Sequence, residues 1–183
     1  MDQHSRLLDL LATRSARSGS FTLASGRQSD LYIDCRPTTM HPEGLSLIGP
    51  LGLHAIGEMA WHPDSVGGLT LGADPVSYAI AYASQLAGLP VRAFTVRKEA
   101  KTHGTGKLIE GAYEHGDRVV VIEDVITTGG SALKAIESVR AVGGQVVGVL
   151  AVVDREEGGR EAIEATGVPV TTLATVREIV ARM

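Results

Sequence analysis

The sequence predicts an α/β domain in which a mainly parallel sheet is flanked by helices. Strand-length apolar runs recur from Val66 onward, clear helical stretches separate two pairs of them, and the runs are continuous rather than alternating. Continuous apolar runs are typical of strands that helices cover on both faces. With 183 residues and 44% apolar composition, the chain has the size and core content of one domain, residues 1–183.

A smaller N-terminal subregion, about residues 1–40, is expected to precede the sheet. Within residues 2–16, four apolar residues have helical spacing: Leu7, Leu8, Leu10 and Leu11. Residues 20–24 and 30–35 alternate in the manner of strands, and the turn residues Ser25-Gly26-Arg27 separate them. These signals predict a helix and a hairpin. A helix should follow from Pro42, a residue that suits a first helical position, with an apolar stripe at Leu45, Ile48, Leu51, Ile56 and Met59.

The sheet and its helices are expected in the remainder of the chain. Five segments are strand candidates: 66–71, 91–96, 119–122, 146–153 and 168–173. Helices are expected over 75–87, 131–142 and 176–182. Residues 96–116 depart from this rhythm as a long polar connection that contains glycines. Connections of this length inside a compact domain are usually functional or disordered.

Composition narrows the classes of function. Seventeen Lys and Arg against twenty-one Asp and Glu give a net charge of −4, which argues against nucleic-acid or membrane-surface binding by the whole chain. A lone cysteine, Cys35, excludes an internal disulfide and fits a reducing compartment. No apolar run approaches the roughly 18 residues that span a bilayer, and no signal peptide is recognisable. We therefore expect a soluble cytoplasmic protein that acts on small molecules.

Residues 119–131 contain the strongest functional signal. A buried strand leads to the carboxylates of Glu123 and Asp124, then to a hydroxyl- and glycine-containing loop, and a helix begins near Ser131. Ligands of open α/β sheets bind beyond the carboxyl ends of the strands. The loop hydroxyls, the backbone amides at the glycines and the helix N-terminus can all converge on an anion. The pattern therefore predicts a phosphate site.

Two better-known phosphate motifs are excluded, and the acidic pair needs a separate explanation. Gly106-Lys107 is followed by Leu108, which rules out a P-loop, and the dinucleotide pattern that starts at Gly104 meets Ile109 at its last position. Carboxylates repel a phosphate, so Glu123 and Asp124 are assigned to ribose hydroxyls and an associated Mg²⁺. The alternative is that they cap a strand end or the next helix.

The stretch 122–131, Ile-Glu-Asp-Val-Ile-Thr-Thr-Gly-Gly-Ser, resembles the phosphoribosyl-pyrophosphate (PRPP) signature of type I phosphoribosyltransferases. Arg97-Lys98-Glu99-x-Lys101-x-His103-Gly104 is similar to the mobile catalytic loop of the orotate phosphoribosyltransferases. Residues 21–26, 32–34, 68–75 and 154–159 also look like that family, in the family's order. The resemblance implies a type I phosphoribosyltransferase fold whose N-terminal helix and hairpin form a hood.

The resemblance also implies a reaction: transfer of ribose 5-phosphate from PRPP to N1 of orotate, with Mg²⁺, giving orotidine 5′-phosphate and diphosphate. The implied catalytic residues are Lys101, His103 and Asp124. The implied PRPP-binding residues are Arg97, Lys98, Lys101, His103, Glu123, Asp124, Val125, Ile126, Thr127, Thr128, Gly129, Gly130 and Ser131. Thr127 and Arg155 would bind orotate. No direct metal ligand is implied, since the Mg²⁺ would be held mainly through PRPP, near Glu123 and Asp124.

Residues 72–75 resemble the family's second pyrophosphate-binding loop. By residue type alone they are also an ordinary strand-to-helix turn, with Asp74 as N-cap and Pro75 at the first helical position. The family's catalytic loop reaches the neighbouring subunit's site, which implies a homodimer. Two departures stand out: Ala24 replaces a family lysine that contacts substrate phosphates, and Glu123 replaces the more usual Asp.

From the sequence alone, purely structural roles for these residues and two other functions remain open. The cations between Arg97 and His103 could be a solvated charged loop, and Arg155 could form a surface salt bridge. Another nucleobase phosphoribosyltransferase would share the 123–131 pattern but not the Arg97–Gly104 pattern. A PRPP-sensing regulator would keep the fold without turnover, although such proteins usually add a nucleic-acid-binding domain or basic face, for which this chain has neither room nor charge.

Overall fold

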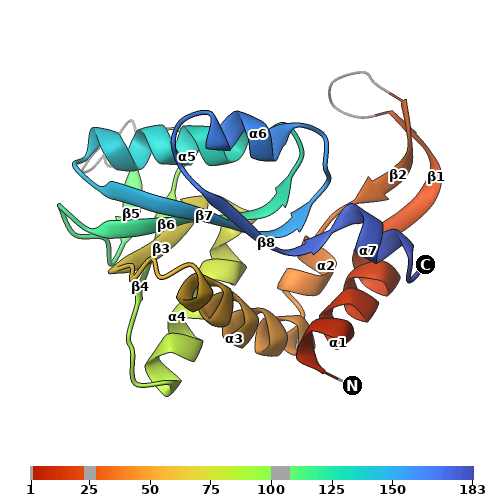
Figure 1. Cartoon of the computed structure of the whole chain (residues 1–183), viewed down its shortest axis with the longest axis horizontal. Helices are drawn as coiled ribbons and strands as arrows, with labels where there is room; N and C mark the ends of the chain where they lie inside the picture. Colours follow the sequence, from red (N-terminus) through yellow and green to blue (C-terminus); the bar gives the residue numbers. More distant parts are fainter. Residues whose placement is uncertain (1, 23–27, 100–107) are drawn as a thin grey trace.

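A six-stranded sheet forms the centre of the computed structural model, which describes residues 2–22, 28–99 and 108–183 (Figure 1). The strand order is β5-β4-β3-β6-β7-β8. The strands are β3 (Ser65–Leu69), β4 (Arg92–Val96), β5 (Ile109–Gly111), β6 (Arg118–Ile126), β7 (Gln145–Asp154) and β8 (Val170–Thr175). All neighbours pair in parallel except β4 and β5, which are antiparallel. The predicted α/β class is confirmed.

Helices cover both faces of this sheet. The helices α3 (Pro42–Glu58) and α4 (Ala73–Leu86) lie on one face, and α5 (Gly130–Ala141) and α6 (Gly159–Glu164) lie on the other (Figure 1). On the central strand β6, Val120 and Ile122 pack in the core cluster that contains α3 and α4 residues. Val119 and Val121 pack in the cluster that contains α5 residues. Both faces of β6 are therefore buried, which explains its continuous apolar run.

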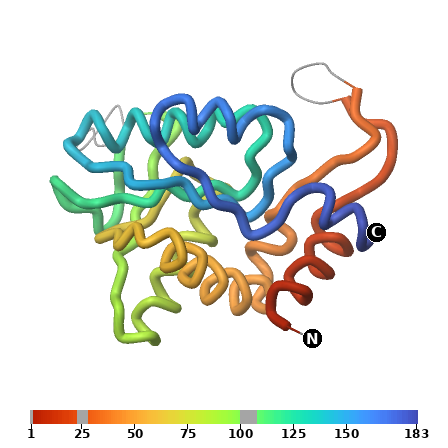
Figure 2. The backbone as a smooth tube through the Cα atoms, viewed as in Figure 1, coloured from red at the N-terminus to blue at the C-terminus, as the bar shows by residue number. Residues whose placement is uncertain are grey.

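The N-terminal helix and hairpin lie beside the main sheet (Figure 2). The helix α1 (Gln3–Leu10) continues into a π-helical turn, η1 (Leu11–Ser15), and the strands β1 (Ala16–Thr22) and β2 (Gln28–Ile33) form a separate antiparallel pair. A short helix, α2 (Arg36–Thr39), follows, and the C-terminal α7 (Val176–Val180) lies near α1. In the described ranges, no helix has both the length and the apolar character needed to cross a membrane.

Three elements were not expected from sequence. The strand β5 lies within the polar connection and pairs Phe94 with Gly111. It has only three residues, too few for a periodic signal. The four-residue α2 and the six-residue α6 are also too short for a clear periodic signal. The π-helical end of α1 also places the start of β1 at Ala16, four residues before the expected strand, because Ala16 already pairs with Ile33.

The strand β6 is longer than predicted, and this changes the setting of the acidic pair. Pairing with β7 continues through Val125 and Ile126, opposite Val153 and Asp154. Glu123 and Asp124 therefore lie within the strand instead of just after it. The loop that follows is correspondingly short, and α5 begins at Gly130.

Candidate active site

A cavity of about 310 Å³ lies where β3 and β6 end, beside the segment that joins β2 to α2. Parallel strands that end at one edge leave such a crevice, and ligands of α/β sheets bind there. Four segments line it: residues 32–36, the wall formed by residues 69–72 (hereafter the 69–72 wall), Lys98, and part of 123–131. Residues far apart in sequence therefore meet at the predicted edge.

Six of the residues assigned to PRPP line this cavity: Lys98, Glu123, Asp124, Val125, Thr127 and Ser131. Ile126, at the end of β6, and Gly129, in the loop that follows, are buried, whereas Thr128 and Gly130 in that loop are exposed. Arg97 forms an ion pair with Glu110, 3.7 Å away, and does not line the cavity. Lys101 and His103 lie outside the described residues. The site assembled from described residues is thus centred on the β6–α5 connection.

The β6–α5 loop (residues 127–131) depends on one glycine conformation. Gly129 has φ +80°, in the left-handed region, and a Cβ there would lie 2.8 Å from the carbonyl oxygen of Gly159. A Cβ at Gly130 would meet nothing closer than Thr128 Oγ1, at 3.9 Å. Because α5 starts at Gly130 and its N-cap, Gly129, has no side chain, the first amides of the helix are available to an anion.

The two carboxylates of the acidic pair have different environments. Glu123 is 6% exposed, and its pKa is raised well above 4.5, first by burial and then by its hydrogen bond and charge interaction with Asp124. The Asp124 amide donates to Glu123 Oε1 at 3.2 Å, and the Val125 amide donates to Asp124 Oδ1 at 3.0 Å. Glu123 is therefore held toward its neutral form, and Asp124 is the more accessible carboxylate of the pair.

Two glycines allow the 69–72 wall to approach the acidic pair. A Cβ at Gly72 would clash with the Asp124 carboxylate, and a Cβ at Gly68 would clash with the carbonyl oxygen of Ile122. The peptide bond between Thr70 and Leu71 in this wall is cis. The wall and Asp124 therefore border the cavity in direct contact with each other.

The alternative interpretation of residues 72–75, in which Asp74 is the N-cap of the next helix, is wrong. The helix begins at Ala73, with Gly72 as N-cap, two residues before the expected start at Pro75. Asp74 is buried, and its carboxylate accepts hydrogen bonds from Thr70 Oγ1 at 2.7 Å and from Thr95 Oγ1 at 2.8 Å. Both oxygens are thus occupied by hydroxyls instead of by amides of the helix.

The segment that joins β2 to α2 supplies groups that residue-level reasoning missed. Arg36 lines the cavity and donates to both oxygens of Asp34, each at 2.8 Å, and these hydrogen bonds lower the pKa of Asp34. Cys35, interpreted from sequence as a packing residue, is fully buried and also borders the cavity. The resemblance pointed to Tyr32-Ile33-Asp34, but only tertiary structure brings Arg36 to this edge.

Lys98 and Arg155 are held by neighbouring elements. The carbonyl oxygen of Lys98 accepts a hydrogen bond from Lys134 Nζ at 2.6 Å, which ties the end of β4 to α5. Arg155 is 9% exposed, forms an ion pair with Glu157 at 2.8 Å, and donates from its amide to the Ile126 carbonyl at 2.9 Å. Arg155 therefore lies beside the end of β6 but does not line the cavity.

Residues 54–174 match the family model described as "Phosphoribosyl transferase domain". This span includes the 69–72 wall, Lys98 and the β6–α5 loop, and thus most of the cavity. A phosphate-binding loop at the carboxyl edge of a mainly parallel sheet is what that class requires. The fold and the site therefore define a phosphoribosyltransferase.

Sequence relatives narrow the class further. An orotate phosphoribosyltransferase of Aquifex aeolicus is 48% identical over 174 residues, 95% of this chain and 94% of the relative. One from Mycobacterium avium is 50% identical over 163 residues, 89% of this chain and 88% of the relative. The solved structure of the Mycobacterium tuberculosis orotate phosphoribosyltransferase with PRPP matches with a TM-score of 0.82 and 42% identity, covering 97% of this chain and 99% of that one. The chain belongs to the orotate phosphoribosyltransferases.

Proposed function

We propose that this family member transfers ribose 5-phosphate from PRPP to N1 of orotate at the described cavity. The products would be orotidine 5′-phosphate and diphosphate, in the de novo pathway to UMP. The observation that carries this proposal is the placement of an anion-binding loop, an accessible carboxylate and Lys98 around one cavity. A phosphorylated sugar that carries a pyrophosphate needs these three kinds of group.

Each part of PRPP has a chemical partner in the cavity. The 5′-phosphate would bind the amides and hydroxyls of residues 127–131, where α5 begins. The ribose hydroxyls would donate to Asp124, because a carboxylate is an acceptor. The pyrophosphate would extend toward the 69–72 wall and Lys98, and Arg97 is next to Lys98 in the chain.

The chemistry requires positioning and charge stabilisation. When pyrophosphate leaves C1 of the ribose, an oxocarbenium-like centre forms and negative charge develops on the departing oxygens. We assign Lys101 and His103 to those oxygens, as cation and proton donor. Both lie outside the described residues, and this assignment rests on the resemblance of residues 97–104 to the family's catalytic loop.

The residues present suit a Mg²⁺ that arrives with PRPP. Mg²⁺ prefers oxygen ligands, keeps several waters and binds substrate phosphates with one or two carboxylates. Asp124 offers such a carboxylate, whereas burial raises the pKa of Glu123 and makes it a poor anionic ligand. When bound, the ion would offset charge on the pyrophosphate.

Orotate would lie between Thr127 and Arg155. Thr127 lines the cavity, and Arg155 is the cation near the end of β7 that could meet an anionic base. Since Arg155 pairs with Glu157 and donates to the Leu31 carbonyl at 3.5 Å, binding orotate directly requires rearrangement of these contacts.

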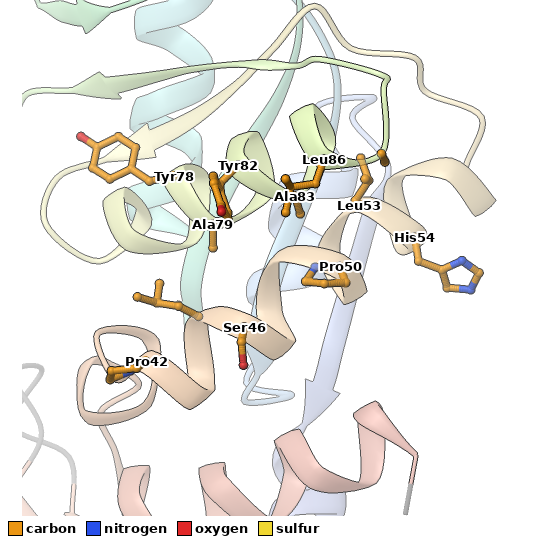
Figure 3. A pocket seen from close by; sticks show the side chains of 12 residues that line it. Pro42, Ser46, Pro50, Leu53, His54, Tyr78, Ala79, Tyr82, Ala83 and Leu86 are labelled. Atoms are coloured by element: carbon orange, nitrogen blue, oxygen red, sulfur yellow. The ribbon is translucent and has the colours of Figure 1, made fainter.

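We further propose that the chain is a homodimer whose contact surface includes an open apolar groove. The groove, about 910 Å³, lies between α3 and α4. Figure 3 shows the side chains of Tyr78, Tyr82 and Leu86 along α4, with Pro50 and Leu53 on α3. Tyr82 and Leu86 are 68% and 71% exposed, and contiguous exposed apolar surface is typical of interfaces. A second copy of the chain is the proposed occupant of the groove. We also propose that the protein acts in the cytoplasm.

The activity is tested with PRPP, Mg²⁺ and a panel of bases: orotate, uracil, adenine, guanine and hypoxanthine. Loss of orotate absorbance is expected, with kcat/KM for orotate far above that for the other bases. A higher kcat/KM for a purine than for orotate would show that the substrate is a purine base and not orotate. PRPP binding without turnover of any base would instead indicate a regulator.

A further inference from the structure

We propose that Asp74 is a positioning residue for PRPP, because its carboxylate fixes the 69–72 wall to strand β4. The inference rests on the proposed function, since it assumes that PRPP occupies the cavity which this wall borders. Asp74 itself does not line the cavity. It would therefore act through the wall.

The carboxylate of Asp74 joins two separate segments. Thr70, in the wall, donates to one oxygen at 2.7 Å, and Thr95, in β4, donates to the other at 2.8 Å. Asp74 is only 9% exposed, so water competes little for these two hydrogen bonds. The Thr70 amide also donates to the Val96 carbonyl at 2.8 Å, which adds a backbone contact between the same segments.

The direction of these hydrogen bonds follows from the chemistry of the groups. A carboxylate only accepts, so the hydroxyl protons of Thr70 and Thr95 point to Asp74. Thr95 has no second hydroxyl proton, and its 3.0 Å contact with Tyr78 is therefore a donation from the Tyr78 hydroxyl. Tyr78 also lines the apolar groove. A chain of hydrogen bonds thus connects the groove to the wall: Tyr78 donates to Thr95, and Thr95 and Thr70 both donate to Asp74.

The position of the wall matters because it touches Asp124. A Cβ at Gly72 would clash with the Asp124 carboxylate, so no side chain separates the wall from the proposed ribose ligand. A shift of the wall changes the shape of the cavity between residues 69–72 and Asp124. If the correct position is populated only part of the time, the apparent affinity for PRPP falls by that fraction.

The test compares Thr95→Val with Thr95→Ser in the full-length chain. Valine keeps the shape of threonine and removes the hydroxyl, whereas serine keeps the hydroxyl. For Thr95→Val we expect the KM for PRPP and its calorimetric dissociation constant to rise roughly two- to tenfold, the effect of one net hydrogen bond, with the KM for orotate unchanged. Thr95→Ser should behave like the wild type. Thr171→Val, the same change at a half-buried position on β8, controls for the substitution itself.

Each outcome decides the proposal. Unchanged PRPP constants in a folded Thr95→Val chain, or equal rises in both KM values, would overturn it. If Thr95→Val does not fold, Asp74→Asn takes its place, because an amide accepts at only one of its two ends, and the same PRPP-specific rise is expected. The wild-type chain is assayed before any variant. If it does not convert orotate and PRPP, the proposed function itself is overturned.

Discussion

Glu123 and Asp124 are adjacent carboxylates with different environments. Burial and the neighbouring Asp124 raise the pKa of Glu123, whereas Asp124 is half-buried at the cavity beside the 69–72 wall. Two neighbouring carboxyl groups in different environments commonly have different roles. We assign substrate contact to Asp124 and a structural, proton-holding role to Glu123.

Replacing Asp124 by Asn should weaken PRPP binding and leave the fold intact. The amide can still accept from the Val125 amide, but it loses the charge that makes hydrogen bonds from ribose hydroxyls strong. Hydrogen bonds to charged groups contribute about 1.5–3 kcal/mol, so the dissociation constant for PRPP should rise roughly ten- to a hundredfold. Calorimetric titration measures this, and thermal unfolding checks the fold. An unchanged constant in the folded variant would remove Asp124 from the site.

Replacing Glu123 by Gln should stabilise the protein increasingly as the pH rises. Since the pKa of Glu123 in the folded chain is above 4.5, its unfolded value, the folded state binds this proton more tightly. Below pH 4.5 Glu123 is protonated in both states, and its burial costs the wild type least. As the pH rises from 4.5 toward the folded pKa, the free energy of unfolding of the wild type falls. Glutamine stays neutral and avoids that loss.

The measurement is the free energy of unfolding of both proteins at several pH values above 4.5. The difference, variant minus wild type, should grow with pH and then level off. Glu137→Gln, at an exposed position on α5, controls for the loss of one carboxylate. A difference that is flat or falls with pH would contradict the buried, proton-holding role of Glu123.

At the scale of elements, the β6–α5 loop contains two glycines with different surroundings. Gly129→Ala should destabilise the fold by at least about 1–2 kcal/mol, because an L-residue is disfavoured at φ +80°. Gly130→Val should fold, because space surrounds the position of its Cβ, but its branched side chain should obstruct the phosphate. PRPP titration and thermal unfolding separate the two effects. Full PRPP affinity in a folded Gly130→Val chain would show that the loop does not hold the phosphate.

Sequence reasoning succeeded where a pattern was local and long. The parallel sheet, α3 and the β6–α5 loop follow from apolar runs, from Pro42 at a first helical position and from a contiguous motif. Asp74 was misjudged because Thr95, which donates a hydrogen bond to one of its carboxylate oxygens, comes from a distant strand. Arg36 was missed for the same reason, since only the packing of the N-terminal segment against β6 brings it to the cavity.

At the scale of the whole molecule, the proposed dimer should allow complementation between two impaired variants. Lys101→Ala should lower turnover by on the order of 10²–10³-fold, the usual cost of one lost charge-stabilising donor. If each loop serves the partner's site, a mixed dimer of Lys101→Ala and Asp124→Asn chains has one site with an intact loop and an intact Asp124. Random exchange of equal amounts should then restore about a quarter of wild-type activity.

The groove supplies a control for this experiment. Leu86→Arg, placed in both variants, should abolish the recovery, because a charge in the groove opposes association. Val180→Arg, on α7 and outside the groove, should not. Mixed dimers, verified by mass, that show no recovery would mean that each loop closes over its own site.

The cavity at the carboxyl ends of β3 and β6 should bind the product of the reaction. A crystal structure of the chain with orotidine 5′-phosphate tests it most directly. We expect the phosphate on the amides of residues 127–131, the ribose hydroxyls on Asp124 and the base toward Thr127. A nucleotide bound elsewhere, or with its phosphate away from the β6–α5 loop, would contradict it.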